Sequence, residues 1–445
     1  MLSRKKSGFG IIGLIFIAAI YYFTAGSAQI TEEMKKQVNN KLTTLQQNGF
    51  GIKEREIKET EEHFVIGFDN PTKITSYLNS QGAEVMQEDI LAFKGLKIGV
   101  DAKYLKDSYS ALSLDIYPVG LPKSMLQEIE EEDKAAVTRI KKMMADKTLL
   151  VHLNFNKLLT GFKGHLKDIN ETFKEEKKIT FISQDFKFEG DIENEKVKTV
   201  RQTLKFFSVE AGKELTMKLS NLKSNYTLTG PSPYDSKSAY TIEKIKIQGE
   251  PEFSLDITNL NVNALSSVKN DLLKSSIISK ADEIKMTEAQ KKYKMNDILF
   301  DFKLDNLDIV SFEALQGVDV NDEKTINTLS QKILSKGITM NIPKFSVKKI
   351  AENGKTMDGF TLSSSLAIDK SFDINAVSQD PLAALNALSS KTNISVSSDL
   401  FALIAQEPRA MMVLMLMPPV EKEGKKIYEI EFVKGKLTVN GTPML

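Results

Sequence analysis

Residues 300–305 read FDFKLD, with an apolar side chain at every second position and a charged one between. Residues 428–433, YEIEFV, open with the same alternation. Successive side chains of a strand point to opposite faces of its sheet, so a period of two predicts strands with one face toward a core and one toward water. Such strands are typical of antiparallel sheets, because parallel sheets are covered on both faces.

A short signature recurs at the ends of three predicted strands. It reads LSNL at 219–222, ITNL at 257–260 and LDNL at 304–307. The unequal intervals argue against a strict solenoid, which needs a fixed period. We interpret the signature as similar strands laid down successively along one growing sheet. Chance recurrence of so short a string is the alternative.

Short helices are predicted to lead directly into strands. These pairs are a helix over 122–146 before a strand over 147–155, a helix over 322–336 before a strand over 337–345, and a helix from Pro381 before a strand over 392–396. Asn321 and Asp380 are the predicted N-caps of the last two helices. The other predicted elements are a helix from Thr31 to Gly49, a hairpin of 52–57 and 63–68, a helix over 71–82, strands over 96–100 and 112–116, and a final hairpin turning at Lys434-Gly435.

Together these patterns predict an α+β fold that is rich in β structure. We expect an extended, curved antiparallel sheet with several short helices packed on it, plus one N-terminal transmembrane helix. The expected regions are a cytoplasmic tail and membrane anchor at 1–30, an α+β region at 31–120, and a repeated helix and strand region at 121–445 that ends in the C-terminal hairpin.

The composition excludes several classes of protein. The 445 residues include no Cys, so disulfides, thiolate zinc sites, iron–sulfur clusters and cysteine nucleophiles are impossible. With 41% hydrophobic and 27% charged residues the chain is of the globular type. The net charge is only +1 and the basic residues are nearly all Lys, without an Arg-rich patch. We therefore expect no nucleic-acid partner.

The N-terminus has the pattern of a membrane-directed segment. Arg4, Lys5 and Lys6 precede an uncharged run over 7–31. Its apolar heart, 9–25, makes about 25 Å of helix, near the lower limit for crossing a bilayer. Tyr21, Tyr22 and Phe23 suit the headgroup level. The predicted anchor residues are Phe9, Ile11, Ile12, Leu14, Ile15, Phe16, Ile17, Ile20, Tyr21, Tyr22 and Phe23.

A cleaved signal peptide is the alternative reading of this segment, because 26–28 reads GSA and offers small residues at the cleavage positions. The apolar run is longer than a signal peptide requires, so we favour an uncleaved anchor. Both readings send residues after 30 across the membrane. The short N-terminal tail carries only cations, which favours a cytoplasmic N-terminus.

Two further stretches carry a family resemblance. Residues 67–82 read GFDNPTKITSYLNSQG and residues 431–444 read EFVKGKLTVNGTPM, in which Asn440-Gly441 favours a turn with positive φ. With the basic N-terminus and the single apolar run, they resemble the YdgA-type bacterial proteins, a family of the Gram-negative cell envelope. The resemblance implies a single-pass protein of the bacterial inner membrane with most of the chain in the periplasm. It implies a β-rich fold and supplies no catalytic residue.

Residue types that carry chemistry are scarce and scattered. The three histidines, His63, His152 and His165, have no metal-ligand partner at helical spacing and are predicted to be structural. Hydrolase, Walker and zinc-protease motifs are absent from the sequence. The run GFGIIG at 8–13 matches a nucleotide-binding pattern only inside the apolar segment. The methionines within 411–417 are predicted to fill a buried helix. We expect no enzyme activity, cofactor or metal.

Two classes of function stay open. The first is a membrane-anchored, non-catalytic scaffold or binding module whose sheet binds another envelope protein. The second is a lipid-binding or lipid-carrying protein with an apolar groove in the curved sheet, similar in layout to the AsmA-like envelope proteins. A concave face that is continuously apolar and free of helix cover favours lipid, and a face filled by helices favours the scaffold.

Overall fold

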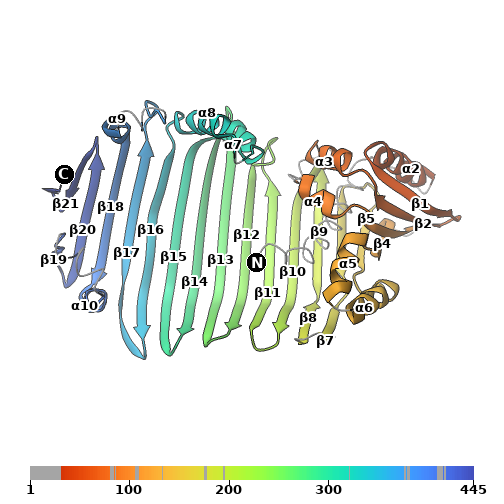
Figure 1. Cartoon of the computed structure of the whole chain (residues 1–445), viewed down its shortest axis with the longest axis horizontal. Helices are drawn as coiled ribbons and strands as arrows, with labels where there is room; N and C mark the ends of the chain where they lie inside the picture. Colours follow the sequence, from red (N-terminus) through yellow and green to blue (C-terminus); the bar gives the residue numbers. More distant parts are fainter. Residues whose placement is uncertain are drawn as a thin grey trace. The chain divides into compact units, whose positions relative to one another are not determined.

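The computed structural model describes residues 32–444, except 81–84, 86, 106–109, 133, 175–177, 194–195, 320, 375–376, 378–380, 408–413 and 415–416. The chain divides into two compact units, Met1–Thr227 and Leu228–Leu445. Of the three regions expected from the sequence, 1–30 lies outside the described residues. The predicted fold class is confirmed in its coarser form, a β-rich antiparallel architecture with several short helices (Figure 1).

The first unit places short helices before and between antiparallel strands. Its helices are α2 (Glu32–Gln47), α3 (Pro71–Ser80), α4 (Gln87–Ala92), α5 (Lys123–Glu132) and α6 (Lys134–Ala145). Its strands are β1 (Phe50–Ile57), β2 (Glu61–Phe68), β3 (Lys97–Tyr104), β4 (Ser110–Gly120), β5 (Val151–Asn156), β6 (Gly161–Leu166), β7 (Ile169–Lys174), β8 (Lys178–Gln184), β9 (Phe186–Glu193), β10 (Lys196–Ala211) and β11 (Leu215–Leu228).

Every pairing in this unit is antiparallel. Strands β1 to β6 pair in chain order, and β6 then pairs with β9. Strand β10 pairs with β8 and β9 along one edge and with β11 along the other, while β7 pairs with β8. One face of this sheet carries the core, in which Phe64 and Phe155 are fully buried with Leu42 of α2 and Ile74 of α3. The opposite face carries polar side chains.

The second unit is a meander of longer strands. They are β12 (Ser236–Gly249), β13 (Phe253–Lys269), β14 (Leu272–Glu288), β15 (Lys291–Asp308), β16 (Thr339–Glu352), β17 (Lys355–Ile368), β18 (Leu388–Ser397), β19 (Val420–Lys422), β20 (Lys425–Val433), β21 (Lys436–Val439) and β22 (Thr442–Pro443). The helices are α7 (Ile309–Gln316), α8 (Glu323–Leu334), α9 (Pro381–Asn386) and α10 (Ser398–Ile404). Strands β12 to β18 pair antiparallel in order, and β18 continues to β20, β21 and β22.

Tight turns set the register of these hairpins. At Asn353-Gly354, Lys434-Gly435 and Asn440-Gly441 both residues have positive φ. This is the conformation of type I′ turns, whose twist matches that of paired strands. The predicted turns at Lys434-Gly435 and Asn440-Gly441 are therefore confirmed.

The recurring Asn-Leu signature corresponds to a backbone feature. Asn221, Asn259 and Asn306 all lie inside long strands and have φ of 51°, 52° and 64°. A left-handed residue inside a strand interrupts the ladder and bends the strand, and Asn tolerates that conformation better than most residues. The signature thus marks a repeated structural device, as the interpretation of successive similar strands requires.

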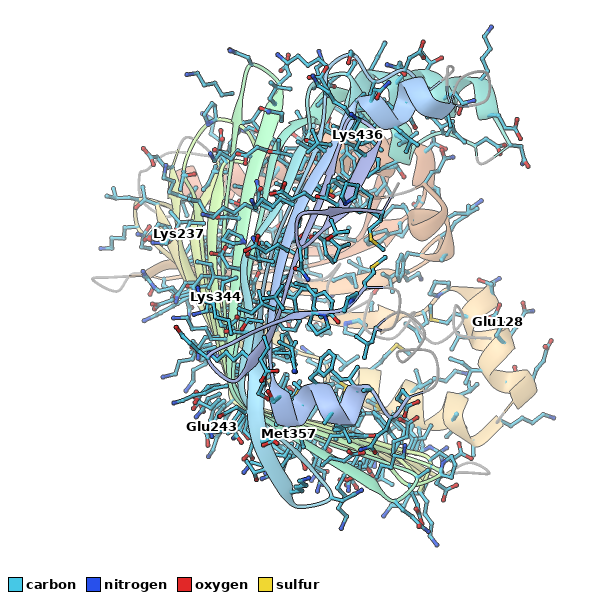
Figure 2. All side chains as sticks on the ribbon, turned by 90° about the vertical axis from the view of Figure 1, so that its left-hand side faces the viewer. Glu128, Lys237, Glu243, Lys344, Met357 and Lys436 are labelled. Carbon is cyan, nitrogen blue, oxygen red and sulfur yellow. The ribbon has the colours of Figure 1, made fainter. Side chains whose placement is uncertain are left out.

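A crease crosses the second unit at the level of Asn259. The strand pairing skips the positions Glu243, Asn259, Asp282, Asp297, Lys348 and Gly359, which lie opposite one another on β12 to β17. Asp297 also has a φ of 52°. A Cβ on Gly359 would lie less than 2.5 Å from the carbonyl oxygen of Val347, so only glycine fits there. Figure 2 shows the strands of this unit bent, with one concave side.

Several predicted elements need correction. The helix expected over 122–146 is two helices, α5 and α6, on either side of residue 133. The strand expected from 147 begins at Val151, because Lys147 has φ of 49° and lies in a turn. The N-cap of α8 is Asp322, whose carboxylate accepts the amide of Thr325, whereas Asn321 donates to Asp319. Asp380 and residues 408–413 lie outside the described residues.

Candidate functional site

The concave side of the second unit is built from rows of apolar side chains that run across the strands. Paired residues of neighbouring strands share a face, so the register defines these rows. We call this surface the apolar face. Below the crease its row is Ile245, Ile257, Ile284, Met295, Ile350 and Met357; above the crease the rows are Ala281, Ile298, Val347, Phe360 and Val396, and then Tyr240, Val262, Ser279, Phe300, Phe345, Leu362, Ile394 and Tyr428.

The crease is what keeps both sets of rows on one face. Ile350 and Phe360 both pack on the buried cluster of Met357, Val396 and Leu400, so they lie on the side of α10. Ile350 pairs with Met295, and the ring of Phe360 contacts that of Phe345, which pairs with Phe300. Odd-numbered and even-numbered residues of β15 therefore share one face, because the left-handed Asp297 between them breaks the alternation.

Part of the apolar face is uncovered within the described residues, whereas its members Ala281, Val347, Met357 and Val396 are buried. Ile257, Ile284, Phe300 and Phe302 are only half-buried, in contrast to the fully buried core of the first unit. Helices α7, α8, α9 and α10 lie at the ends of the strands and not across their middle (Figure 1). Phenylalanines pack edge to face along the open part, with centroids 5.8 Å apart for Phe300 and Phe345 and 5.1 Å for Phe345 and Phe360.

The opposite face of the same strands is charged. Lys237 and Lys344 project from the convex side (Figure 2). Lysines and carboxylates of neighbouring positions pair there, with Lys349 2.6 Å from Asp358 and Lys294 2.7 Å from Glu283. Hydrogen bonds from Lys285 and Lys294 lower the pKa of Glu283 to about 2. This face is an ordinary solvated sheet surface.

One hydroxyl on the apolar face lacks a hydrogen bond. Tyr428 is 9% exposed, and its hydroxyl oxygen has no hydrogen-bond partner in the part of the chain that the structure describes. Burial raises the pKa of this phenol, so the hydroxyl stays protonated. A buried hydroxyl without a partner is costly, and it offers one polar contact to an occupant of the face.

The polar face of the first unit brings together residues that are far apart in the sequence. His63 on β2 pairs with Asp101 on β3, Asp101 with Asp115 on β4, Asp115 with His152 on β5, and His152 with His165 on β6. The three histidines and two aspartates thus form one cross-strand row. The three histidines are far apart in the sequence and were predicted only as separate structural residues, so this row was not predicted.

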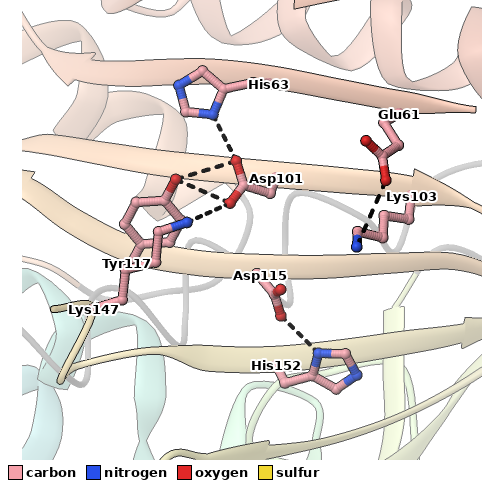
Figure 3. Close-up of polar contacts among 8 residues, drawn as sticks. All are labelled: Glu61, His63, Asp101, Lys103, Asp115, Tyr117, Lys147 and His152. Carbon is pink, nitrogen blue, oxygen red and sulfur yellow. Dashed lines mark hydrogen bonds and ion pairs between the residues drawn. The ribbon is translucent and has the colours of Figure 1, made fainter. Parts of the chain in front are cut away.

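Asp101 is the most connected residue of the row (Figure 3). Its carboxylate accepts hydrogen bonds from Lys147 at 2.7 Å and from the Tyr117 hydroxyl at 3.0 Å, and it lies 2.6 Å from Nδ1 of His63. Burial alone would raise the pKa of Asp101, but the bonds from Lys147, His63 and Tyr117 outweigh it and lower the pKa. Asp101 is therefore a firmly ionised anchor for its neighbours.

The second half of the row is a pair of histidines. Nδ1 of His152 lies 2.7 Å from Asp115, and the ring centroids of His152 and His165 are 5.1 Å apart. Burial and the adjacent His152 lower the pKa of His165. The lowered pKa favours a neutral His165 ring at neutral pH, and the contacts of both rings are those of structural histidines, as predicted from the sequence.

The chemistry open to this row is limited. Burial and the Asp101 carboxylate raise the pKa of Tyr117, so its phenol is a hydrogen-bond donor and not an activated nucleophile. Within the described residues, no three His, Asp or Glu side chains converge as metal ligands. The row is best described as a polar network that fixes the strands and lines the surface.

The predicted anchor residues Phe9 to Phe23 and the run 8–13 lie outside the described residues. Among the described helices, none has the length and apolar character needed to cross a bilayer. Of the apolar stretch at 411–417, only Leu414 and Met417 are described, and both are half-buried. The proposed core role of its methionines stays a prediction.

Comparison of this chain with family models, curated proteins and solved structures gives no match. The resemblance to YdgA-type envelope proteins therefore stays a prediction that rests on the quoted residues.

Proposed function

We propose that this protein is a membrane-anchored, non-catalytic periplasmic protein that binds the acyl chains of lipids on its apolar face. Of the two functions left open by the sequence, the lipid carrier is favoured by one observation. Many apolar side chains on the concave side, among them Ile257, Ile284 and Phe300, are only half-buried, and the described helices of this unit lie at the strand ends.

A continuous series of half-buried apolar side chains across several strands suggests that a ligand covers this face. Soluble proteins rarely leave contiguous apolar patches larger than a few hundred Å² in water. Covering roughly 400 Å² of such surface stabilises a complex by about 10 kcal/mol before the cost of association is subtracted. On the convex face of the same strands, exposed apolar side chains such as Leu265 and Ile278 stand among charged ones and form no continuous row.

The dimensions of the face suit an acyl chain. The row through Phe300 crosses eight strands from Tyr240 on β12 to Tyr428 on β20. With a strand spacing of about 4.8 Å the row is roughly 34 Å long. One leaflet of a bilayer core is about 15 Å thick, so the row accommodates an extended acyl chain with space to spare.

The chemistry of the face favours lipid over a protein partner. A protein segment brings backbone amides and carbonyls that need hydrogen bonds when they are buried. The rows above and below the crease offer apolar side chains almost throughout, and the strand backbones are already paired with one another. The Tyr428 hydroxyl is suited to one ester or carboxyl oxygen. An N-terminal anchor would hold the face close to the membrane, where acyl chains are supplied.

A matched pair of neighbouring residues on β14 tests the proposal. Ile277 lies on the apolar face opposite Phe302, and Ile278 lies on the convex face opposite Asp301. We expect Ile277→Asp to weaken binding of a fluorescent fatty acid to the full-length protein by about tenfold or more, because it places a charge beside the acyl chain. Ile278→Asp adds the same charge and should leave the affinity unchanged.

Native mass spectrometry of the full chain, released from mild detergent, supplies the second readout. We expect co-purified lipid on the parent protein and less of it on Ile277→Asp. Equal fatty-acid binding by the two Asp variants, or a parent protein that carries a protein subunit and no lipid, would favour the scaffold function instead.

A further inference from the structure

A basic hollow lies on the polar face of the first unit. Its volume is about 610 Å³, and its floor is formed by β5, β6, β9, β10 and β11. The charged side chains that line it are Lys163, Lys187, Glu189, Arg201 and Lys223, with His152 and His165 at one side. The hollow is formed wholly by the first unit and is independent of the apolar face and of the function proposed for it.

The register explains why the cations gather here. His165 pairs with Lys187, Lys187 with Thr203, and Thr203 with Lys223, so the His–Asp row continues into the hollow as a basic row. The adjacent row on the same face is formed by Asn154, Lys163, Glu189, Arg201 and Asn225. Directly paired side chains have Cβ atoms about 5 Å apart, and successive residues on one face of a strand are about 7 Å apart. Lys187, Arg201 and Lys223 lie on the three neighbouring strands β9, β10 and β11, and Lys163 lies opposite Glu189, so the flexible side chains of all four cations line one hollow.

The charges inside the hollow are not balanced. Glu189 is the only carboxylate among its lining residues, and it pairs with Arg201 at 2.8 Å. Lys187 reaches Asp185 at 2.7 Å, while Lys163 and Lys223 form no salt bridge within the described residues. On the convex face of the second unit, by contrast, several lysines, including Lys349 and Lys391, have a carboxylate partner. The register places no two of these cations directly opposite each other, but four cations line the hollow against one carboxylate, and this excess of positive charge calls for an explanation.

The charge of Lys187 also affects the pKa of the neighbouring His165. Burial is the first cause that lowers the pKa of His165, and the charges of His152 and Lys187 add to it. The carboxylates of Asp115 and Asp168 oppose this effect without cancelling it. Lys187 of the hollow is therefore among the charges that act on the His165 ring.

We infer that the basic hollow binds a phosphate group, either free or as the headgroup of a lipid. Phosphate has several acceptor oxygens and about two negative charges near neutral pH, which match two unpaired lysines and the free donors of Arg201. The amides of Asn154 and Asn225 and the hydroxyl of Thr203 line the same hollow and supply neutral donors. A phosphate there faces one carboxylate, Glu189, whose charge Arg201 already offsets.

The test uses the full-length protein and a double variant, Lys163→Gln with Lys223→Gln. Both side chains are exposed, so the fold should survive, which circular dichroism and melting check. The control is Lys237→Gln with Lys344→Gln, which removes the same charge from exposed positions of the second unit. Titration with inorganic phosphate at constant ionic strength, followed by calorimetry and by the NMR shift of the His165 ring, measures binding.

We expect saturable binding of inorganic phosphate with a rise in the pKa of His165, since an added anion favours the imidazolium. The Lys163/Lys223 variant should bind at least about tenfold more weakly, and the control variant should bind like the parent. The second arm uses short-chain phosphatidic acid against short-chain phosphatidylcholine. Saturable phosphate binding identifies a free phosphate site. A headgroup site is identified if the protein prefers phosphatidic acid and does not bind free phosphate. In that case the Lys163/Lys223 variant should lose the preference and the Ile277→Asp variant should keep it.

Two results would overturn the inference. One is the absence of saturable binding of both phosphate and phosphatidic acid, with the His165 signal unchanged. The other is equal weakening by the Lys163/Lys223 variant and the Lys237/Lys344 control, which would mean that only the net charge of the protein matters.

Discussion

The ammonium nitrogen of Lys147 lies 2.7 Å from Oδ2 of Asp101. The contact joins the turn that follows α6 to the middle of β3, and the same ammonium lies 3.8 Å from the centroid of the Tyr117 ring. A cation held by both a carboxylate and an aromatic face is strongly localised. The ring of Tyr117 in turn lies over Gly99, so four residues fix the position of β3 and β4 against the turn.

Asp101→Asn should destabilise the protein by about 1–2 kcal/mol at neutral pH, because the ammonium of Lys147 loses its anionic partner. The pKa of Asp101 is lowered in the folded state, so its contribution is fully present above the unfolded pKa of about 3.9 and is lost as pH falls through the folded pKa. The difference between variant and parent should therefore shrink below about pH 4. Urea unfolding at several pH values measures it.

Asp358→Asn is the control for this prediction. Asp358 pairs with Lys349 on the exposed face of the second unit, with 70% of its side chain exposed. Its loss should cost no more than about 0.5 kcal/mol. Equal effects of the two substitutions at neutral pH would contradict a special role for Asp101.

Gly99→Ala should cost about 1–3 kcal/mol. A Cβ at this position would lie 2.8 Å from Cε2 of Tyr117 and 2.9 Å from Cγ1 of Val119, so both side chains must shift. At Gly120 a Cβ would come no closer than 3.4 Å to the flexible side chain of Lys97. Thermal melting of Gly99→Ala and Gly120→Ala compares the two, and a similar loss in both would show that the Tyr117 ring adapts freely.

Phe302→Ala should cost about 1–2 kcal/mol, whereas Phe155→Ala should cost about 3–5 kcal/mol. Phe155 is 1% exposed in the core of the first unit, and Phe302 is half-buried on the apolar face. Truncation of a half-exposed ring removes less buried surface and leaves no closed cavity. Denaturant unfolding of the lipid-free protein gives both values, and equal costs would mean that the apolar face is covered in solution.

Local patterns predicted the elements of this fold well. The alternation in residues 300–305 lies within β15, and the periodicity of 122–146 identified helical residues, because both signals depend on neighbours along the chain. The pattern failed at backbone irregularities. Asp297 breaks the alternation inside β15, so Met295 and Phe300 share a face although a strict period of two places them on opposite faces.

The row of three histidines and two aspartates, and the basic hollow, could not be predicted from the sequence for a different reason. His63 and His165 share a row only through the pairing of five successive strands. Each register depends on turns and bulges, and a slip of one residue in any pair moves a side chain to the other face. A single sequence contains no signal that fixes all these registers together. The Asn-Leu signature was the one available clue to a bulge.

Asn259→Val should destabilise the second unit by about 1–2 kcal/mol, because a β-branched residue is strained at a φ of 52°. Asn259→Gly relieves that strain and should change stability by less than about 0.5 kcal/mol, since only the exposed bond to Asp282 is lost. Asn263→Val, at an exposed and regularly paired position of the same strand, should also be nearly neutral. Equal effects of the two Val substitutions would contradict the left-handed conformation of Asn259.

The last prediction concerns the N-terminal segment, which lies outside the described residues. We expect residues 1–28 to stay attached and residues after 30 to lie in the periplasm, because the apolar run over 9–25 follows the cations Arg4, Lys5 and Lys6. A reporter that is active only in the periplasm, fused after residue 35, should therefore be active. N-terminal sequencing of the mature protein should begin near residue 1. A mature chain that begins at Gln29 would mean that the segment is a cleaved signal peptide, and the apolar face would then belong to a protein free to leave the membrane. An inactive reporter would instead indicate the opposite orientation, with residues after 30 in the cytoplasm.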